Sequence, residues 1–200
     1  MSLSVGCCWW TGIWPAQSTI HTDMSAPLLP WVGKLREQNE KSCRDLLMRT
    51  FKKEIESILA QLMGSSWAPH AGVQDVIAEY QHFVGAAKTP NQTRRVSLQI
   101  FHASRAIDSF LAYVAGNEAA KPGSAAAPAY WTLGKSLNYI RTNSISGSRF
   151  TPPTDTDLTL LKDDRNEYLH RANNFPTDGD IRRFLTRTTS GIKEATTFPT

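Results

Sequence analysis

The sequence predicts an all-α protein, an up-and-down bundle of about four long helices with one or two short extra helices. After residue 33, apolar residues recur every three or four positions through most of the chain, which is the spacing of one helical face. No stretch shows a convincing alternation of apolar and polar residues, the pattern of a half-buried strand. Glycine or proline follows most of the helical stretches, where these residues commonly end a helix.

The first half of the chain contains three predicted helices. They cover residues 34–63, 73–84 and 92–115. Each is followed by a glycine that can adopt the left-handed conformation of a helix C-terminus, namely Gly64, Gly85 and Gly116. Residues 117–129, NEAAKPGSAAAPA, contain little to bury and are expected to form a surface loop.

The second half of the chain contains three more predicted helices. Tyr130, Leu133, Leu137 and Ile140 mark a shorter helix. The next helix is expected to be capped by Thr154 or Asp155 and to run until Pro176. The last is expected to be capped by Thr177 or Asp178. Its inward face would comprise Ile181, Phe184, Leu185 and Thr188, and its solvent face Arg182, Arg183 and Arg187.

Composition describes an ordinary globular chain. Of the 200 residues, 40% are hydrophobic and 20% charged, so residues 32–200 are expected to form a single helical-bundle domain. The formal net charge of +4 permits an acidic partner such as RNA without requiring one. Cys7 and Cys8 are adjacent and Cys43 stands alone, so no zinc ligand set is expected. With no apolar stretch of membrane-spanning length and no secretion signal, we expect a cytoplasmic protein that does not enter membranes.

The N-terminal segment differs from the rest. Trp9, Trp10 and Trp14 are close together, yet no lysine or arginine precedes Lys34. A membrane-surface anchor would normally carry basic residues on its polar face. Residues 1–31 are therefore expected to be a leader that is disordered or loosely packed, and Met24 is an alternative start.

One predicted helix carries an arginine in its apolar stripe. The stripe consists of Leu158, Leu161, Arg165, Tyr168 and Ala172. Burying an unpaired guanidinium costs several kcal/mol, so a partner, a ligand or a second chain should lie near Arg165.

The segment RNEYLH contains Arg165, a polar residue at Asn166 and, after three more residues, His170. This pattern resembles the signature of the HEPN superfamily, helical-bundle proteins of which many are metal-independent endoribonucleases. The family motif is an arginine, four to six residues of which the first is usually polar, and a histidine, on the penultimate long helix. The preceding TLGKSLNYI resembles the short helix before the motif in many members. The resemblance covers residues 130–176 and is only architectural from 32 to 115.

The resemblance implies an enzyme that cuts RNA by transphosphorylation, in which the 2′-hydroxyl attacks the adjacent phosphate, and that uses no metal or other cofactor. His170 would be the general acid or base, Arg165 would stabilise charge on the phosphate, and Asn166 would orient either group. Positions expected to bind RNA are Arg171, Lys162, Arg182 and Arg183. The family also implies a toxin or phage-defence effector restrained by an antitoxin or regulatory protein. Ala172 replaces the tyrosine that nucleotidyltransferase antitoxins modify, so that form of control is not expected.

Geometry adds an expectation about assembly. Five steps along a straight helix place Arg165 and His170 roughly 140° apart, whereas Asn166 and His170 share a face. Either the helix is distorted before Pro176, or two copies of the chain combine their motifs at one site. We expect a homodimer with a composite active site.

Alternative interpretations remain open. Arg165 could pair with Asp157, Asp163 or Asp164 within its own bundle, which would make the motif structural. Arg95 and His102 also match the bare spacing, but a valine follows the arginine, and both could be solvated neighbours. A non-catalytic module that binds RNA or a partner protein is the second functional hypothesis, and an unrelated helical adaptor is the third.

Overall fold

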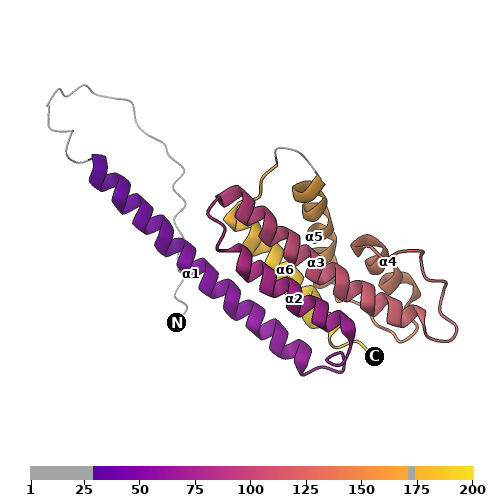
Figure 1. Cartoon of the computed structure of the whole chain (residues 1–200). Coiled ribbons are helices and arrows are strands. Elements are labelled where there is room, and N and C mark those ends of the chain that lie inside the picture. Colours follow the sequence, from indigo (N-terminus) through magenta and orange to yellow (C-terminus); the bar gives the residue numbers. More distant parts are fainter. Residues whose placement is uncertain (1–28, 171–173) are drawn as a thin grey trace. The chain divides into compact units, whose positions relative to one another are not determined.

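The structure is a computed structural model that describes residues 29–170 and 174–200, apart from several side chains near the start of the first helix. The described residues form α-helices and no β-strand, so the all-α prediction is confirmed (Figure 1). The helices are α1 (Leu29–Met63), α2 (Ala71–Ala86), α3 (Gln92–Ala119), α4 (Leu133–Asn143), α5 (Pro152–His170) and α6 (Asp178–Ala195).

The chain divides into two units, Met1–Cys43 and Arg44–Thr200, with the boundary inside α1. Most of the leader expected over residues 1–31, including its tryptophans, lies outside the described residues. The second unit contains the rest of α1, the other helices and the candidate site.

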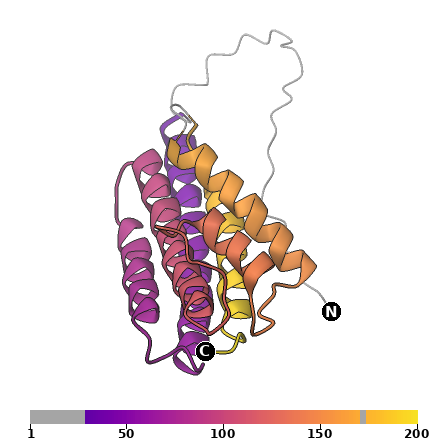
Figure 2. The ribbon, with the colours of Figure 1, turned by 90° about the vertical axis from the view of Figure 1, so that its right-hand side faces the viewer.

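Helix α3 is the centre of the second unit. It packs against α2, α4, α5 and α6, and α5 also packs against α6. Figure 2 shows the axes of α2, α3 and α6 roughly parallel to one another, while α5 crosses them obliquely. Side chains of α3 can therefore contact both α2 and α5, the helix that carries Arg165 and His170.

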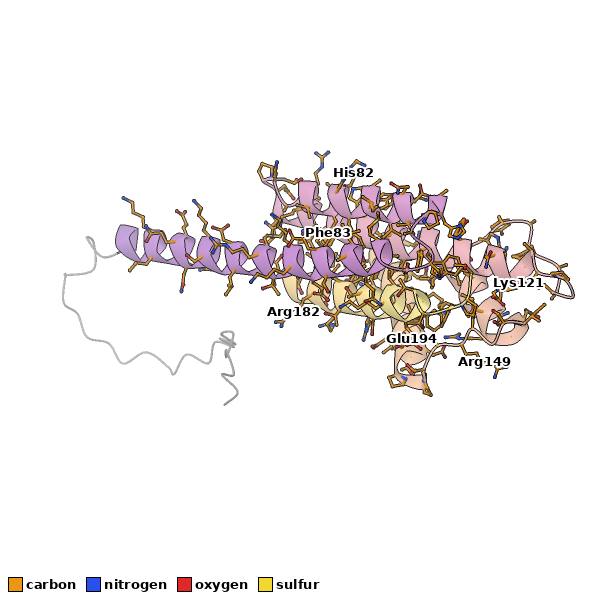
Figure 3. The ribbon with its side chains drawn as sticks, turned by 90° about the horizontal axis from the view of Figure 1, so that it is seen from below. His82, Phe83, Lys121, Arg149, Arg182 and Glu194 are labelled. Atoms are coloured by element: carbon orange, nitrogen blue, oxygen red, sulfur yellow. The ribbon has the colours of Figure 1, made fainter. Side chains whose placement is uncertain are left out.

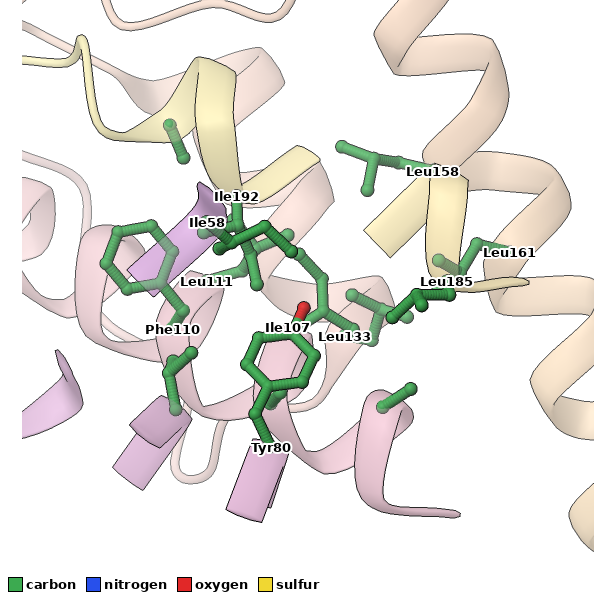
Figure 4. Packing of buried hydrophobic residues seen from close by; sticks show 14 of the residues in the cluster. Ile58, Tyr80, Ile107, Phe110, Leu111, Leu133, Leu158, Leu161, Leu185 and Ile192 are labelled. Atoms are coloured by element: carbon green, nitrogen blue, oxygen red, sulfur yellow. The ribbon is translucent and has the colours of Figure 1, made fainter. Parts of the chain in front are cut away.

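The core is a continuous cluster of aliphatic and aromatic side chains (Figure 4). Ile107, Phe110 and Leu111 of α3 are fully buried within it, together with Leu158 and Leu161 of α5. Truncating one such leucine to alanine typically costs about 2–5 kcal/mol. The leucines that begin the motif stripe are therefore core residues, as their spacing predicts.

In the described part of the chain, three helices begin after a residue whose side chain caps the first turn: Asn91 before α3, Thr132 before α4 and Thr177 before α6. The side chain of Thr177 accepts a hydrogen bond from the Asp180 backbone N–H at 3.3 Å, while the Asp180 carboxylate accepts from the Thr177 N–H at 2.7 Å. This capping box confirms Thr177 as the N-cap of α6. The N-cap of α4 is Thr132, so the helix begins at Leu133 and the expected start at Tyr130 is wrong.

Other predicted boundaries are also wrong, beginning with α1, which starts at Leu29 rather than at residue 34. Helix α2 continues through Gly85 to Ala86, and α3 continues through Gly116 to Ala119. A glycine permits a helix to end but does not force it to, and packing decides. Helix α5 begins at Pro152, ahead of both predicted caps, because proline suits the first helical position, where no N–H donor is needed.

The longer α3 places Glu118 at a buried hydrogen-bond centre. Its side chain, only 1% exposed, accepts from Lys121 Nζ at 2.8 Å and Ser144 Oγ at 2.9 Å. It also accepts from the backbone N–H groups of Ile145 at 3.1 Å and Ser146 at 3.3 Å. Burial alone would raise the pKa of this carboxyl, but the hydrogen bonds from Lys121, Ser146 and Ser144 outweigh burial and hold the pKa at about 2.

Close helix packing depends on one glycine of α6. A Cβ atom at Gly191 would lie 2.5 Å from Leu158 Cδ2 and 3.3 Å from Ile107 Cδ1, so only glycine fits where α6 meets α5 and α3. By contrast, a Cβ at Gly85 of α2 would meet nothing within 4 Å. The helix packing therefore requires a glycine at position 191 but would accommodate a larger side chain at position 85.

The end of α6 and the residues after it are hydrogen-bonded to the end of α1 and to the turn that follows α1. The indole Nε1 of the buried Trp67 donates to the carbonyl oxygen of Phe198 at 3.1 Å. Gln61 Nε2 donates to Thr196 Oγ1 at 2.8 Å and to the Lys193 carbonyl at 3.0 Å. Parts of the chain about 130 residues apart are thus joined by specific hydrogen bonds.

Of the helices in the described ranges, none combines the length and apolar character needed to cross a bilayer.

Candidate functional site

Arg165 lies on the side of α5 that faces α3, and its partner is in the same chain. Arg165 Nη2 donates to Asp108 Oδ2 of α3 at 2.7 Å. The two side chains are 23% and 16% exposed, so the pair is largely removed from water. The expectation that the arginine needs a partner is met by Asp108, rather than by the three aspartates of α5 considered from the sequence.

Asp108 also connects this pair to the start of α4. Burial raises the pKa of the Asp108 carboxyl above its ordinary value, although Arg165, the backbone N–H of Leu133 and Arg105 act in the opposite direction. Oδ1 of Asp108 and Nε of Arg165 are buried without a hydrogen-bond partner. The pair is therefore held in place but incompletely satisfied, an arrangement that carries a free-energy cost.

Two of the aspartates considered as partners of Arg165 instead contact α6. Arg187 Nη1 donates to Asp164 Oδ2 at 2.5 Å, and Arg187 Nε lies 3.5 Å from Asp157 Oδ1. The Arg187 side chain is only 18% exposed, so the prediction that it stays in solvent is wrong. It is displaced from water because α5 and α6 pack together and two carboxylates of α5 face it.

Asn166 and His170 are exposed, and His170 is the last residue of α5. They are four residues apart on a continuous helix and therefore share a face. Arg165 is directed at α3 instead, so the roughly 140° separation expected from His170 applies to this helix. Within one chain, the motif thus presents an exposed imidazole and amide on one side and a paired guanidinium on another.

The expected RNA-binding residues are dispersed. Arg182 is exposed on the outer side of α6 (Figure 3). Arg183 is also exposed, and its Nη2 donates to Asp180 one turn earlier. Lys162 Nζ lies 3.5 Å from Asp163 Oδ1, and Arg171 lies outside the described residues.

Helix α5 also carries many carboxylates near the motif. They are Asp155, Asp157, Asp163, Asp164 and Glu167. Cationic side chains lie beside four of them, supplied by Arg141, Lys162 and Arg187. These cations offset part of the repulsion that the carboxylates would exert on a polyanion.

The second match to the motif spacing is structural in this fold. Arg95 is buried and its Nη2 donates to both carboxylate oxygens of Asp178, at 3.1 and 3.4 Å. His102 Nδ1 lies 2.8 Å from Glu79 Oε2, and Arg105 Nε lies 3.4 Å from the other oxygen of that carboxylate. The interpretation of Arg95 and His102 as solvated neighbours is wrong, because each ties α3 to another segment.

Sequence reasoning missed three residues beside the motif. Asp108 directly follows the core residue Ile107. A carboxylate so close to the core could have been proposed from the sequence as the partner of Arg165, which lies in the apolar stripe of another helix. Tyr130 is 64% exposed, and Lys135 Nζ lies 3.3 Å from the centre of its ring. Tyr130 precedes α4 and Lys135 lies in its first turn. The backbone N–H of Leu133, the first residue of α4, donates to Asp108.

Within the residues described, no three His, Cys, Asp or Glu side chains gather as a bound metal ion would require. No protein-family model, curated protein or solved structure matches the chain. A functional assignment must therefore come from the chain's own residues.

Proposed function

We propose that this chain is a metal-independent endoribonuclease of HEPN type that acts as a twofold homodimer. The observation that supports this best is the placement of Asn166 and His170 together on the exposed end of α5, with Arg165 on the same helix. In the described part of the chain, one further helix follows, as the family pattern requires.

The chemistry would be transphosphorylation. The 2′-oxygen of RNA forms a bond to the adjacent phosphorus, the bond to the 5′-oxygen of the next nucleotide breaks, and His170 takes a proton from the nucleophile or gives one to the leaving oxygen. A histidine has an ordinary pKa near 6.5, which suits proton transfer at neutral pH. The products are a 2′,3′-cyclic phosphate and a 5′-hydroxyl.

Arg165 would stabilise charge on the phosphate oxygens. A guanidinium has five N–H donors, so the hydrogen bond to Asp108 leaves others that can bind an anion. Loss of one well-placed donor to a developing oxyanion commonly costs about 3 kcal/mol in the transition state. Asn166 would orient the imidazole or the phosphate from the same helical face as His170.

A second copy of the chain would complete the site. Because Arg165 faces α3 while His170 faces solvent, one copy is poorly arranged to direct both at one phosphate. In a twofold dimer, the histidine of one protomer can approach the arginine of its partner. We further propose a cytoplasmic toxin or phage-defence effector that an antitoxin or regulatory protein restrains.

The test is cleavage of transfer RNA and total RNA in EDTA by the wild type, His170→Ala and Arg165→Ala. We expect the wild type to cut, leaving cyclic phosphate ends, and both variants to lose activity. His82→Ala is the matched control, because His82 is an exposed histidine on α2 (Figure 3). Cleavage that survives both motif substitutions, or that EDTA abolishes, would refute the proposal.

A non-catalytic module that binds RNA or a protein is the second candidate. The Asp108–Arg165 pair favours it, because the guanidinium already has an anionic partner within the chain. RNA binding without any cleavage, together with an effect of Arg165→Ala on stability alone, would support this alternative.

A further inference from the structure

A surface made by Tyr130, Lys135 and Lys162, called here the α4–α5 platform, lies next to the motif helix. We infer that it binds single-stranded RNA, with a base stacked on Tyr130 and phosphates beside the two lysines. The inference rests on the proposed function and deepens it by naming the form of the substrate.

Tyr130 is the aromatic part of the platform. It is 64% exposed and does not belong to the core, so its ring is accessible from solvent. Lys135 Nζ lies 3.3 Å from the ring centre, over one face of the ring. The cation holds the ring on one side, and the high exposure of Tyr130 gives a flat ligand such as a base access to the ring.

The lysines connect this ring to the motif helix. An ideal Cβ at Gly134 would lie 3.6 Å from Cδ of Lys162, so the aliphatic part of Lys162 passes over the first turn of α4. Lys162 is three residues, less than one helical turn, before Arg165, and Lys135 follows Gly134 directly. Asp108, which accepts from Arg165, also contacts the backbone N–H of Leu133 at the start of α4. The platform and Arg165 are therefore parts of one continuous region.

This chemistry favours a single strand over a duplex. In a duplex the bases are stacked on one another and their faces are not accessible, whereas an unpaired base can stack on an aromatic side chain. Two lysines alone would attract any polyanion, including an acidic protein. The exposed ring beside them is what favours an unpaired nucleic acid strand.

The test is binding by the full chain, measured by fluorescence anisotropy. The probe is a labelled single strand of 2′-O-methyl RNA of about 12 nucleotides, within the length that such surfaces cover. It lacks the free 2′-hydroxyl and is not cut, so binding is measured apart from cleavage. We expect tighter binding to this strand than to a duplex of the same length or to polyglutamate.

Substitutions locate the contact. Tyr130→Ala should weaken binding roughly 5- to 150-fold, whereas Tyr130→Phe should retain the affinity because the ring persists. Lys135→Gln should reduce the salt dependence of log K by about 0.7, the contribution of one phosphate contact. Phe101→Ala and Lys88→Gln are the matched controls, because both residues are exposed on other parts of the described structure.

The outcomes separate this inference from the proposed enzyme. Equal affinity for single strand, duplex and polyglutamate, or full affinity in Tyr130→Ala, would overturn the platform even if the protein cuts RNA. Selective binding that depends on Tyr130 would support the platform, and its persistence in His170→Ala would show that it does not depend on catalysis.

Discussion

Replacing Arg165 by alanine tests whether the motif arginine also holds the bundle together. The substitution removes the guanidinium from the 2.7 Å contact with Asp108 and leaves a largely buried carboxylate without its cation. Breaking a fully buried pair typically costs about 3–5 kcal/mol, and an exposed pair about 0–1 kcal/mol. With side chains 23% and 16% exposed, we expect Arg165→Ala to lower the free energy of unfolding by about 2 kcal/mol.

A double-mutant cycle isolates the pair from the rest of the arginine. Asp108→Ala should also destabilise, but the double variant should lose less than the sum of the two single losses, by about 1–2 kcal/mol. Far-ultraviolet circular dichroism during urea unfolding gives the required free energies. A coupling free energy below about 0.5 kcal/mol would refute the reasoning, because the pair would then contribute nothing specific to stability.

Asp108→Asn tests whether the Asp108 carboxyl makes the free energy of unfolding depend on pH. Because the folded pKa of Asp108 is raised, this carboxyl contributes stability that is complete below its unfolded pKa near 4. That contribution is lost as pH rises through the folded pKa. Asp108→Asn should remove this decline. An unchanged pH profile would show that another group causes it.

Three further predictions concern stability and can be measured by urea unfolding. The lowered pKa of Glu118 stabilises the wild type by roughly 3 kcal/mol above pH 4.5, and this stabilisation is lost as pH falls toward 2. Glu118→Gln should lack this pH-dependent stabilisation. Equal acid sensitivity of the two proteins would contradict the assignment. Gly191→Ala should destabilise by about 1–3 kcal/mol, whereas Gly85→Ala, its matched control, should stabilise by about 0.5–1 kcal/mol; effects of the same sign would show that the close contact at Gly191 is absent in solution. Thr177→Ala should cost about 0.5–2 kcal/mol, and no loss would mean that the α6 cap is not formed.

Local pattern was enough to predict the helices but not every end. Amphipathic spacing identified the helical segments, and sequence alone narrowed the cap of α6 to Thr177 or Asp178 because capping hydrogen bonds are made within one turn. The part of α3 past Gly116 carries Glu118, whose hydrogen-bond partners include Ser144 and Ile145, which follow α4. Contacts between residues more than 25 positions apart cannot be predicted from the pattern of neighbouring residues.

The candidate site illustrates the same limit. The apolar stripe showed that Arg165 needs a counter-charge, yet its partner is 57 residues away in sequence. Arg187 was expected in solvent because α6 places it beside polar positions, and only the packing of α5 against α6 explains its carboxylate partners. Spacing within a helix fixes which residues share a face, but the opposing face depends on the tertiary arrangement.

The bond from Trp67 to Phe198 affects how the polypeptide acquires its structure during translation. The carbonyl group of Phe198, which accepts the hydrogen bond from the Trp67 indole, is synthesised 131 residues after Trp67. Until Phe198 has left the ribosome, the turn between α1 and α2 lacks this hydrogen bond, although Phe110 and Tyr113, which pack against Trp67, are already present. The contacts of this turn are therefore completed only after the residues that follow α6 are made, and chains that still lack them are the species on which chaperones and proteases act.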